Sequence, residues 1–173
     1  MWHHSLTGLN PAMRLTAYTD YTLRTLMHLG LNRDKLMTIQ DIANVHGISK
    51  NHLMKVVHQL GLSGMVETVR GRNGGLRLNK EPADINIGEV VRNTETDFFM
   101  AECFSPGNFQ CGYSSDCTLK GVLYSATAAY LEVLDAVTLE DLIKKDRRYT
   151  AGQVGQDAAP KPIRIHPAKP QAH

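Results

Sequence analysis

Two short amphipathic segments, separated by a glycine between residues 38 and 60, constrain the fold of this chain most strongly. The first begins at Thr38-Ile-Gln-Asp41, a pattern typical of a capping box, and continues with apolar residues at helical spacing. Gly47 suits the end of that helix, and Ser49 is a good N-cap for the next helix, which runs through KNHLMKVVHQL. Two short helices joined by a tight turn that contains glycine are typical of a helix-turn-helix.

Strand signals follow directly after the second of these helices. MVETVR is rich in β-branched residues, GRNGG predicts a turn, and LRLN predicts a second strand. Asn73-Gly74 is a dipeptide preferred in two-residue hairpin turns. A further helix is expected upstream, within MRLTAYTDYTLRTLMHLG. A helix-turn-helix followed by a basic hairpin predicts a winged helix, and the alternative is a helical hairpin and a β-hairpin without a role in DNA binding.

A long helix is predicted from about residue 118 to 136, because its apolar residues recur at steps of three and four. That helix either packs on its own domain or pairs with the same helix of a second subunit. We expect a mainly α protein with a small β-hairpin, which combines a winged helix-turn-helix domain with a long C-terminal dimerisation helix. The apolar stripe consists of Leu119, Val122, Leu123, Ala126, Tyr130, Val133, Leu134 and Val137.

The 173 residues are expected to divide into four regions. Residues 1–12 form a flexible extension, or mark an upstream start codon chosen in place of Met13, and 13–82 form the winged helix. Residues 83–148 hold a cysteine-containing loop and the dimerisation helix. Residues 149–173 are rich in Pro, Gly, Ala and Gln, which predicts a disordered tail.

The formal net charge is only +2, so the distribution of charge must identify any nucleic-acid partner. On the predicted helix after Ser49, the apolar side chains share one face and donor-rich side chains share the other. A glycine-rich hairpin tip flanked by arginines can approach a phosphate ridge or a narrow minor groove. A solvated polar face is the alternative for the helix. The candidate DNA-binding residues are Lys50, Asn51, His52, Lys55, His58, Arg70, Arg72 and Asn73.

No secretory signal or membrane-spanning segment is recognisable, which indicates a cytoplasmic protein. All three cysteines fall in the pattern Cys103-x7-Cys111-x5-Cys117. Thiolates are preferred ligands of iron–sulfur clusters and zinc, and either centre would need a fourth ligand from elsewhere. Spacing alone leaves a cluster, a zinc site, a thiol switch and buried structural cysteines open.

A small redox or electron-transfer protein is the alternative of another class. Against it, a ferredoxin site requires four cysteines, and the chain contains no nucleotide- or flavin-binding glycine motif. No pairing of a nucleophile with a base stands out either, so we expect no enzyme activity.

Several segments occur in an order that resembles the bacterial iron–sulfur family of winged-helix repressors, over residues 13 to 145. These segments are MRLTAYTDYTLRTLM, SKNHLMKVVHQLG, ETVRGRNGGLRL, INIGEVVR and the three cysteines. The resemblance implies a homodimer that binds double-stranded operator DNA and a cluster held by Cys103, Cys111 and Cys117. It is closest to the nitric-oxide-sensing branch, where a [4Fe–4S] cluster takes its fourth ligand from the partner subunit, at the position of Asp20. A [2Fe–2S] cluster is the alternative.

The resemblance also implies a mechanism of sensing. Nitric oxide would displace ligands from the iron, the two DNA-reading helices would lose their spacing, and repression would end. The long gap between Cys103 and Cys111 and the sequence AECF also resemble the iron-responsive branch of the family. An iron-responsive repressor is therefore the alternative function.

Overall fold

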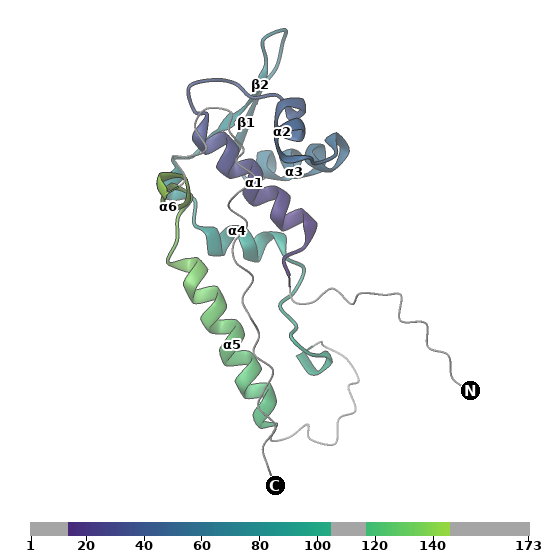
Figure 1. Cartoon of the computed structure of the whole chain (residues 1–173), viewed down its shortest axis with the longest axis vertical. Coiled ribbons are helices and arrows are strands. Elements are labelled where there is room, and N and C mark those ends of the chain that lie inside the picture. Colours follow the sequence, from purple (N-terminus) through teal and green to yellow (C-terminus); the bar gives the residue numbers. More distant parts are fainter. Residues whose placement is uncertain (1–13, 105–116, 146–173) are drawn as a thin grey trace, which may run out of the picture.

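The computed structural model describes residues 14–104 and 117–145 (Figure 1). The mainly helical fold with one β-hairpin, predicted from the sequence, is confirmed. No helix within these two ranges is long and apolar enough to cross a membrane. In chain order the elements are α1 (Ala17–Leu31), α2 (Ile39–His46), α3 (Lys50–Leu62), β1 (Val66–Val69), β2 (Gly75–Leu78), the 3-10 helix η1 (Pro82–Asp84), α4 (Ile87–Thr94), the 3-10 helix η2 (Glu102–Phe104), α5 (Thr118–Asp135) and α6 (Leu139–Lys145).

The helix-turn-helix forms as the sequence predicts. The Thr38 hydroxyl accepts a hydrogen bond from the backbone N–H of Asp41 at 3.1 Å, and the Asp41 carboxylate accepts one from the backbone N–H of Thr38 at 3.0 Å. Gly47 ends α2 with a φ of 63°, in the left-handed region that glycine adopts without strain. The side chain of Ser49 then caps α3. These local interactions fix where α2 ends and α3 begins.

One hydrophobic core holds the head of the molecule together, by which we mean α1 to α4, the hairpin, η1 and α6. Leu26 of α1 and Leu53 of α3 have no exposed surface, and neither does Leu139 of α6. The core thus includes a residue that lies 86 positions beyond Leu53 in the chain. Its other fully or nearly buried apolar residues include Leu29, Ile42, Val56, Leu60, Val66, Leu76, Ile85, Ile87, Val90 and Val91.

The hairpin differs from the sequence prediction at its turn. The strands pair from Val66 opposite Leu78 to Val69 opposite Gly75, so the loop spans residues 70–74 and Asn73-Gly74 does not form a two-residue turn. A Cβ at Gly74 would lie 2.2 Å from the Val69 carbonyl oxygen, which excludes any side chain there. The longer loop arises because Gly71 takes a φ of 117°, which lets the chain reverse earlier than at Asn73.

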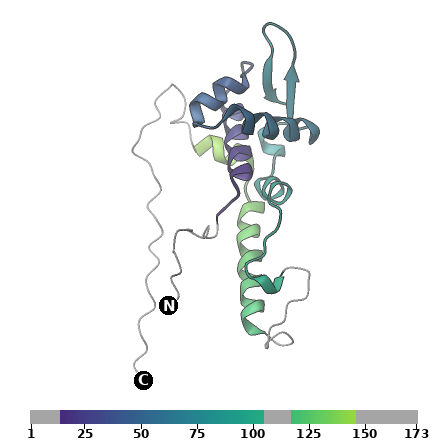
Figure 2. The same cartoon turned by 90° about the vertical axis from the view of Figure 1, so that its right-hand side faces the viewer.

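Helix α5 is attached to the head at its C-terminal end. The Asn86 amide donates a hydrogen bond to the Asp135 carbonyl oxygen at 2.7 Å, and Arg92 forms a two-pronged ion pair with the Asp135 carboxylate. A Cβ at Gly88 would overlap the Asp135 carboxylate, so α4 and α5 approach this closely only because residue 88 is glycine. Away from this joint, α5 extends from the head on the side opposite the hairpin (Figures 1 and 2).

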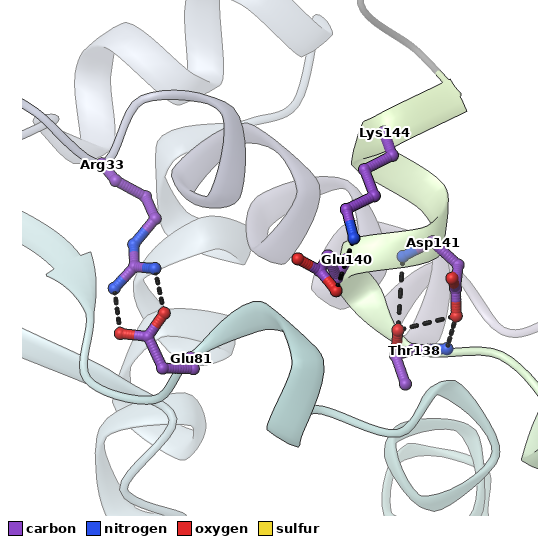
Figure 3. A network of polar contacts seen from close by, with 6 residues as sticks. All are labelled: Arg33, Glu81, Thr138, Glu140, Asp141 and Lys144. Atoms are coloured by element: carbon purple, nitrogen blue, oxygen red, sulfur yellow. Dashed lines mark hydrogen bonds and ion pairs between the residues drawn. The ribbon is translucent and has the colours of Figure 1, made fainter.

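Helix α6 returns the chain to the head. A second capping box starts it, in which the Thr138 backbone N–H and hydroxyl both donate to the Asp141 carboxylate, at 2.9 and 2.7 Å (Figure 3). Nearby, Arg33 after α1 pairs with Glu81 before η1. These contacts close the head around Leu139, on the face away from α3.

Candidate DNA-binding surface and cysteine site

The outer face of α3 is polar and exposed. Leu53, Val56, Val57 and Leu60 are buried, as the sequence predicts. The predicted DNA-binding side chains of this helix are all exposed, and its two lysines form no ion pair with any of the described residues. These five side chains, which the sequence analysis had selected, are Lys50, Asn51, His52, Lys55 and His58. The structure therefore leaves this face free to meet another molecule.

One of these side chains has a neighbour that the sequence analysis missed. The His52 ring stacks on Tyr21 of α1, with centroids 6.0 Å apart and an angle of 27° between the rings. Tyr21 is half-buried, so the stack brings the start of α1 to the same surface as the start of α3. Met54, 44% exposed, is a further side chain of α3 that the sequence analysis did not select.

The hairpin projects beyond the body of the head (Figure 2). Arg70, Arg72 and Asn73 are exposed in its loop, and no ion pair within the described residues engages either arginine. Arg77 differs, because its guanidinium pairs with Glu67 across the two strands at 2.8 Å. The hydrogen bond that Arg77 donates to Glu67 raises the pKa of Arg77. Within the hairpin, the arginines that remain available to a partner are therefore those at the tip, Arg70 and Arg72.

Two of the three cysteines lie in the described part of the chain, and Cys111 lies outside it. Cys103 in η2 and Cys117 at the N-cap of α5 are half-buried free thiols. The Lys120 ammonium lies 5.8 Å from the centroid of the Phe104 ring, so η2 lies beside the first turn of α5. The Cys117 side chain makes no capping hydrogen bond, and thiolates are preferred ligands of iron–sulfur clusters. These two residues fit a thiolate-bound cluster.

The Asp20 carboxylate lies in the first turn of α1, where Arg24 holds it at 2.8 Å. Its side chain is 39% exposed. Within the described residues, no three side chains of His, Cys, Asp or Glu gather closely enough to hold a metal ion. Asp20 therefore does not join Cys103 and Cys117 in a three-ligand group of the same chain.

The predicted apolar stripe of α5 divides between two environments. Leu134 and Val137 pack against the core of the head. Leu119, Val122 and Val133 are 63%, 59% and 66% exposed, and no residue of α5 is buried. A monomeric protein rarely leaves such a stripe open to water, so the exposed part of α5 indicates an interface.

An exposed polar recognition helix beside a basic hairpin, both carried by a helix-turn-helix, defines a winged-helix protein of the DNA-binding class. The family model Rrf2, described as an iron-dependent transcriptional regulator, matches residues 15–145, and the chain belongs to this family. It is therefore a transcriptional regulator.

Relatives of the chain carry the same assignment. It is 56% identical to the HTH-type transcriptional regulator NsrR of Bacillus licheniformis over 132 residues, which are 76% of this chain and 92% of the relative. Its identity to the NsrR of Bacillus subtilis is also 56%, over 133 residues, 76% of this chain and 91% of that one. The solved structure of "T. potens IscR" superposes with a TM-score of 0.64 over 82% of this chain and 94% of that one, at 24% identity, which supports the fold alone.

Proposed function

We propose that the chain is a repressor of the NsrR type, which acts in the cytoplasm, binds operator DNA as a homodimer and releases it in response to nitric oxide. The observation that carries the proposal is the exposed polar face of α3 beside a hairpin tip whose arginines are in no ion pair among the described residues. Residues 13–82 would bind DNA, and 83–148 would hold the cluster and form the dimer. The relatives named NsrR support this assignment across nine-tenths of their length.

The DNA contacts follow from the position of each side chain. Asn51 and His52, near the start of α3, would read base edges in a major groove. Lys50, Lys55 and His58 would contact phosphates and neighbouring bases. The remaining contacts would come from the hairpin tip, in a minor groove or on the phosphate ridge, through Arg70, Arg72 and Asn73.

The homodimer would bury the exposed stripe of α5. Leu119, Val122 and Val133 recur at intervals of three and eleven residues, which keeps them on one side of the helix. A second copy of α5 would cover them with the same side chains. The two α3 helices would then meet successive major grooves, about 34–36 Å apart or a multiple of this.

Cys103, Cys111 and Cys117, together with Asp20 of the partner subunit, would hold a [4Fe–4S] cluster, with a [2Fe–2S] cluster as the alternative. When bound, such a cluster supplies iron atoms that nitric oxide can attack. Asp20 is held by Arg24 in the described chain, so its carboxylate would have to give up that ion pair in order to bind a cluster. Because Asp20 belongs to α1 of the head, this ligand would connect the head of one subunit with the cysteines of the other.

A cysteine series and an aspartate pair test the proposal on anaerobically purified protein, by visible absorbance and by operator binding. Alanine at Cys103, Cys111 or Cys117 should give colourless protein without operator affinity. Asp20→Ala should keep its colour, since three thiolates remain, but bind operator more weakly. Asp34→Ala, on an exposed loop, is the matched control and should resemble the parent. Parent protein that is colourless, or that binds no promoter fragment, would contradict the proposal.

The signal separates the two repressor functions. Nitric oxide should release the parent protein from operator within a single anaerobic titration. Release by an iron chelator, with no response to nitric oxide, would favour the iron-responsive alternative. Reversible reduction of a cluster without any DNA binding would instead indicate an electron-transfer protein.

A further inference from the structure

Two histidines meet between α1 and α2. His28 lies in the last turn of α1, and His46 is the last residue of α2. Their ring centroids are 5.2 Å apart, and the planes are nearly perpendicular at 79°. The Nε2 atom of each ring is buried and has no hydrogen-bond partner among the described residues. Buried polar atoms nearly always have such a partner, so this pair requires a physical explanation.

The surroundings of the pair do not accommodate a proton on either Nε2. The rings line a cavity of about 120 Å³ together with Arg24, Met27 and Leu31. A guanidinium only donates hydrogen bonds, a thioether accepts them weakly, and leucine does neither. A protonated imidazole would therefore find no oxygen among the lining side chains, whereas two neutral rings pack edge to face.

The charges around His28 do not compensate for its burial. Burial lowers the pKa of His28, and the Lys35 ammonium in the loop after α1 lowers it further. The Asp41 carboxylate of α2 acts in the opposite direction, as the smallest of the three effects. The Oδ2 atom of Asp41 accepts hydrogen bonds from both the backbone N–H and the hydroxyl of Thr38, so turning this carboxylate toward the ring would break the capping box.

Burial and nearby charges act on the pKa of His46 in the same way. Burial lowers its pKa most, and the neighbouring His28 and Arg24 lower it further, while Asp20 opposes them weakly. The Asp20 carboxylate is committed to Arg24 at 2.8 Å. Both histidines occupy the last turn of a helix, where the helix dipole favours a cation. Burial outweighs that preference here, because it is the largest effect on both pKa values. The nearby guanidinium also argues against a metal ion at these two nitrogens.

The position of His46 links the pair to the DNA-binding surface. Gly47 follows it directly and takes the left-handed conformation that ends α2. Ser49, two residues later, caps α3. A displacement of His46 therefore moves the turn that sets where α3 begins.

We propose that the His28–His46 pair is an acid-sensitive joint in the head, so that a fall in pH below about 6.5 separates α1 from α2 and lowers operator affinity. The folded chain keeps both rings neutral where the unfolded chain takes up protons. Stability is thus complete above about pH 6.5 and is lost as the pH falls from there toward the folded-state values. The ordinary pKa values of carboxyl groups, about 3.9 for Asp and 4.3 for Glu, lie below this window. Only the operator readout rests on the proposed function.

The first measurement uses the full-length parent dimer without DNA. NMR titration of the histidine rings should place both members of the pair below about 6.5, the ordinary value for histidine. As the pH falls, the equilibrium constant for unfolding should rise about tenfold per pH unit for each proton that only the unfolded chain binds. A titration of both rings at or above about 6.5 overturns the proposal.

The second measurement compares the parent with the double variant His28→Phe/His46→Phe, which keeps two packed rings and removes their titration. Its unfolding should lose the acid dependence between pH 6.5 and 5, whereas His58→Phe, at an exposed position, should retain it in the unfolding measurement. If the double variant does not fold, His46→Gln replaces it, and half of the acid dependence should disappear. If the variant shows the same acid dependence of unfolding as the parent, the proposal that the His28–His46 pair is acid-sensitive is wrong.

The third measurement follows operator affinity from pH 7.5 to 5.5, with the cluster absorbance recorded at each step. The parent should lose about tenfold or more in affinity, and the double variant should lose clearly less. Equal losses in both proteins assign the effect to the cluster or to the DNA contacts and overturn the joint. If the parent does not bind operator at pH 7.5, the proposed function is contradicted instead. The unfolding measurements then still test whether the His28–His46 pair is acid-sensitive.

Discussion

Helices α1 and α5 are the two longest helices, and they meet their surroundings in opposite ways. The 15 residues of α1 include Leu26 and Leu29, buried in the core, and three buried threonines. The 18 residues of α5 include none that is buried, although leucine, valine and tyrosine are frequent in it. Apolar content therefore does not distinguish a helix that is buried within its own chain from one that stays exposed. The head encloses its own core, whereas α5 leaves its apolar stripe exposed in the described chain, as the proposed dimer would require.

The largest effect is expected at the exposed apolar stripe of α5. Val133→Asp places a charge on the exposed stripe and should convert the dimer into monomers, with a loss of operator affinity of about 10²–10⁴-fold because the two heads no longer bind as one unit. Tyr124→Asp, at a 68% exposed residue nine positions before Val133 and therefore on the opposite side of α5, should remain dimeric. Sedimentation and operator titration measure both properties. A monomeric parent protein would remove the comparison altogether.

A smaller loss is expected inside the head. Leu26→Ala removes a side chain with no exposed surface and should lower the free energy of unfolding by about 2–5 kcal/mol. This loss should not depend on protein concentration. Val133→Ala should instead produce a loss that varies with concentration, since it acts through association. Urea unfolding at two protein concentrations distinguishes them, and equal behaviour would show that α5 is not an interface.

The DNA-binding face should divide into specific and general contacts. Asn51→Ala should cost about 1–3 kcal/mol at the operator and little on random DNA. Arg72→Ala should weaken binding to all DNA and lower the salt slope by about one unit. Arg77→Ala is the matched control, because Glu67 already engages that guanidinium. Parent-like binding by the first two variants would contradict the winged-helix docking.

The smallest effect is expected at the start of α2. Thr38→Ala removes the two hydrogen bonds of the Thr38 hydroxyl, one to the Asp41 carboxylate and one from the Asp41 backbone N–H, and should cost about 1 kcal/mol of the free energy of unfolding. Thr38→Ser keeps the hydroxyl and should be nearly neutral. Urea unfolding with an unchanged m-value measures the difference. A neutral Thr38→Ala would mean that tertiary packing alone defines this helix end.

Much of the head could be predicted from the sequence because its signals are local. The capping box at Thr38, the end of α2 at Gly47 and the buried face of α3 each depend on residues within a few positions of one another. The hairpin was predicted, but its turn was not. Asn73-Gly74 favours a two-residue turn, and the left-handed Gly71 moves the reversal of the chain to an earlier position.

Contacts between distant segments could not be predicted. Leu139 completes the core of the head from beyond α5, and nothing near it in the sequence indicates that packing. Met37 likewise pairs with Leu76 of β2 through two backbone hydrogen bonds, and the stack of Tyr21 on His52 joins α1 to α3. The proposed cluster site could not be derived in full either, because Asp20 and the two described thiols do not form one group within the described residues.

The joint at Gly88 and Asp135 gives α5 the mechanics of a lever with its pivot at one end. Eighteen residues at 1.5 Å per residue place the Cys117 end about 27 Å from that pivot. A shift of about 1 Å at the cysteines then turns the helix by only about 2° about that pivot. Any side chain larger than hydrogen at residue 88 would push α4 and α5 apart at this contact, so that α5 could rotate without moving the head.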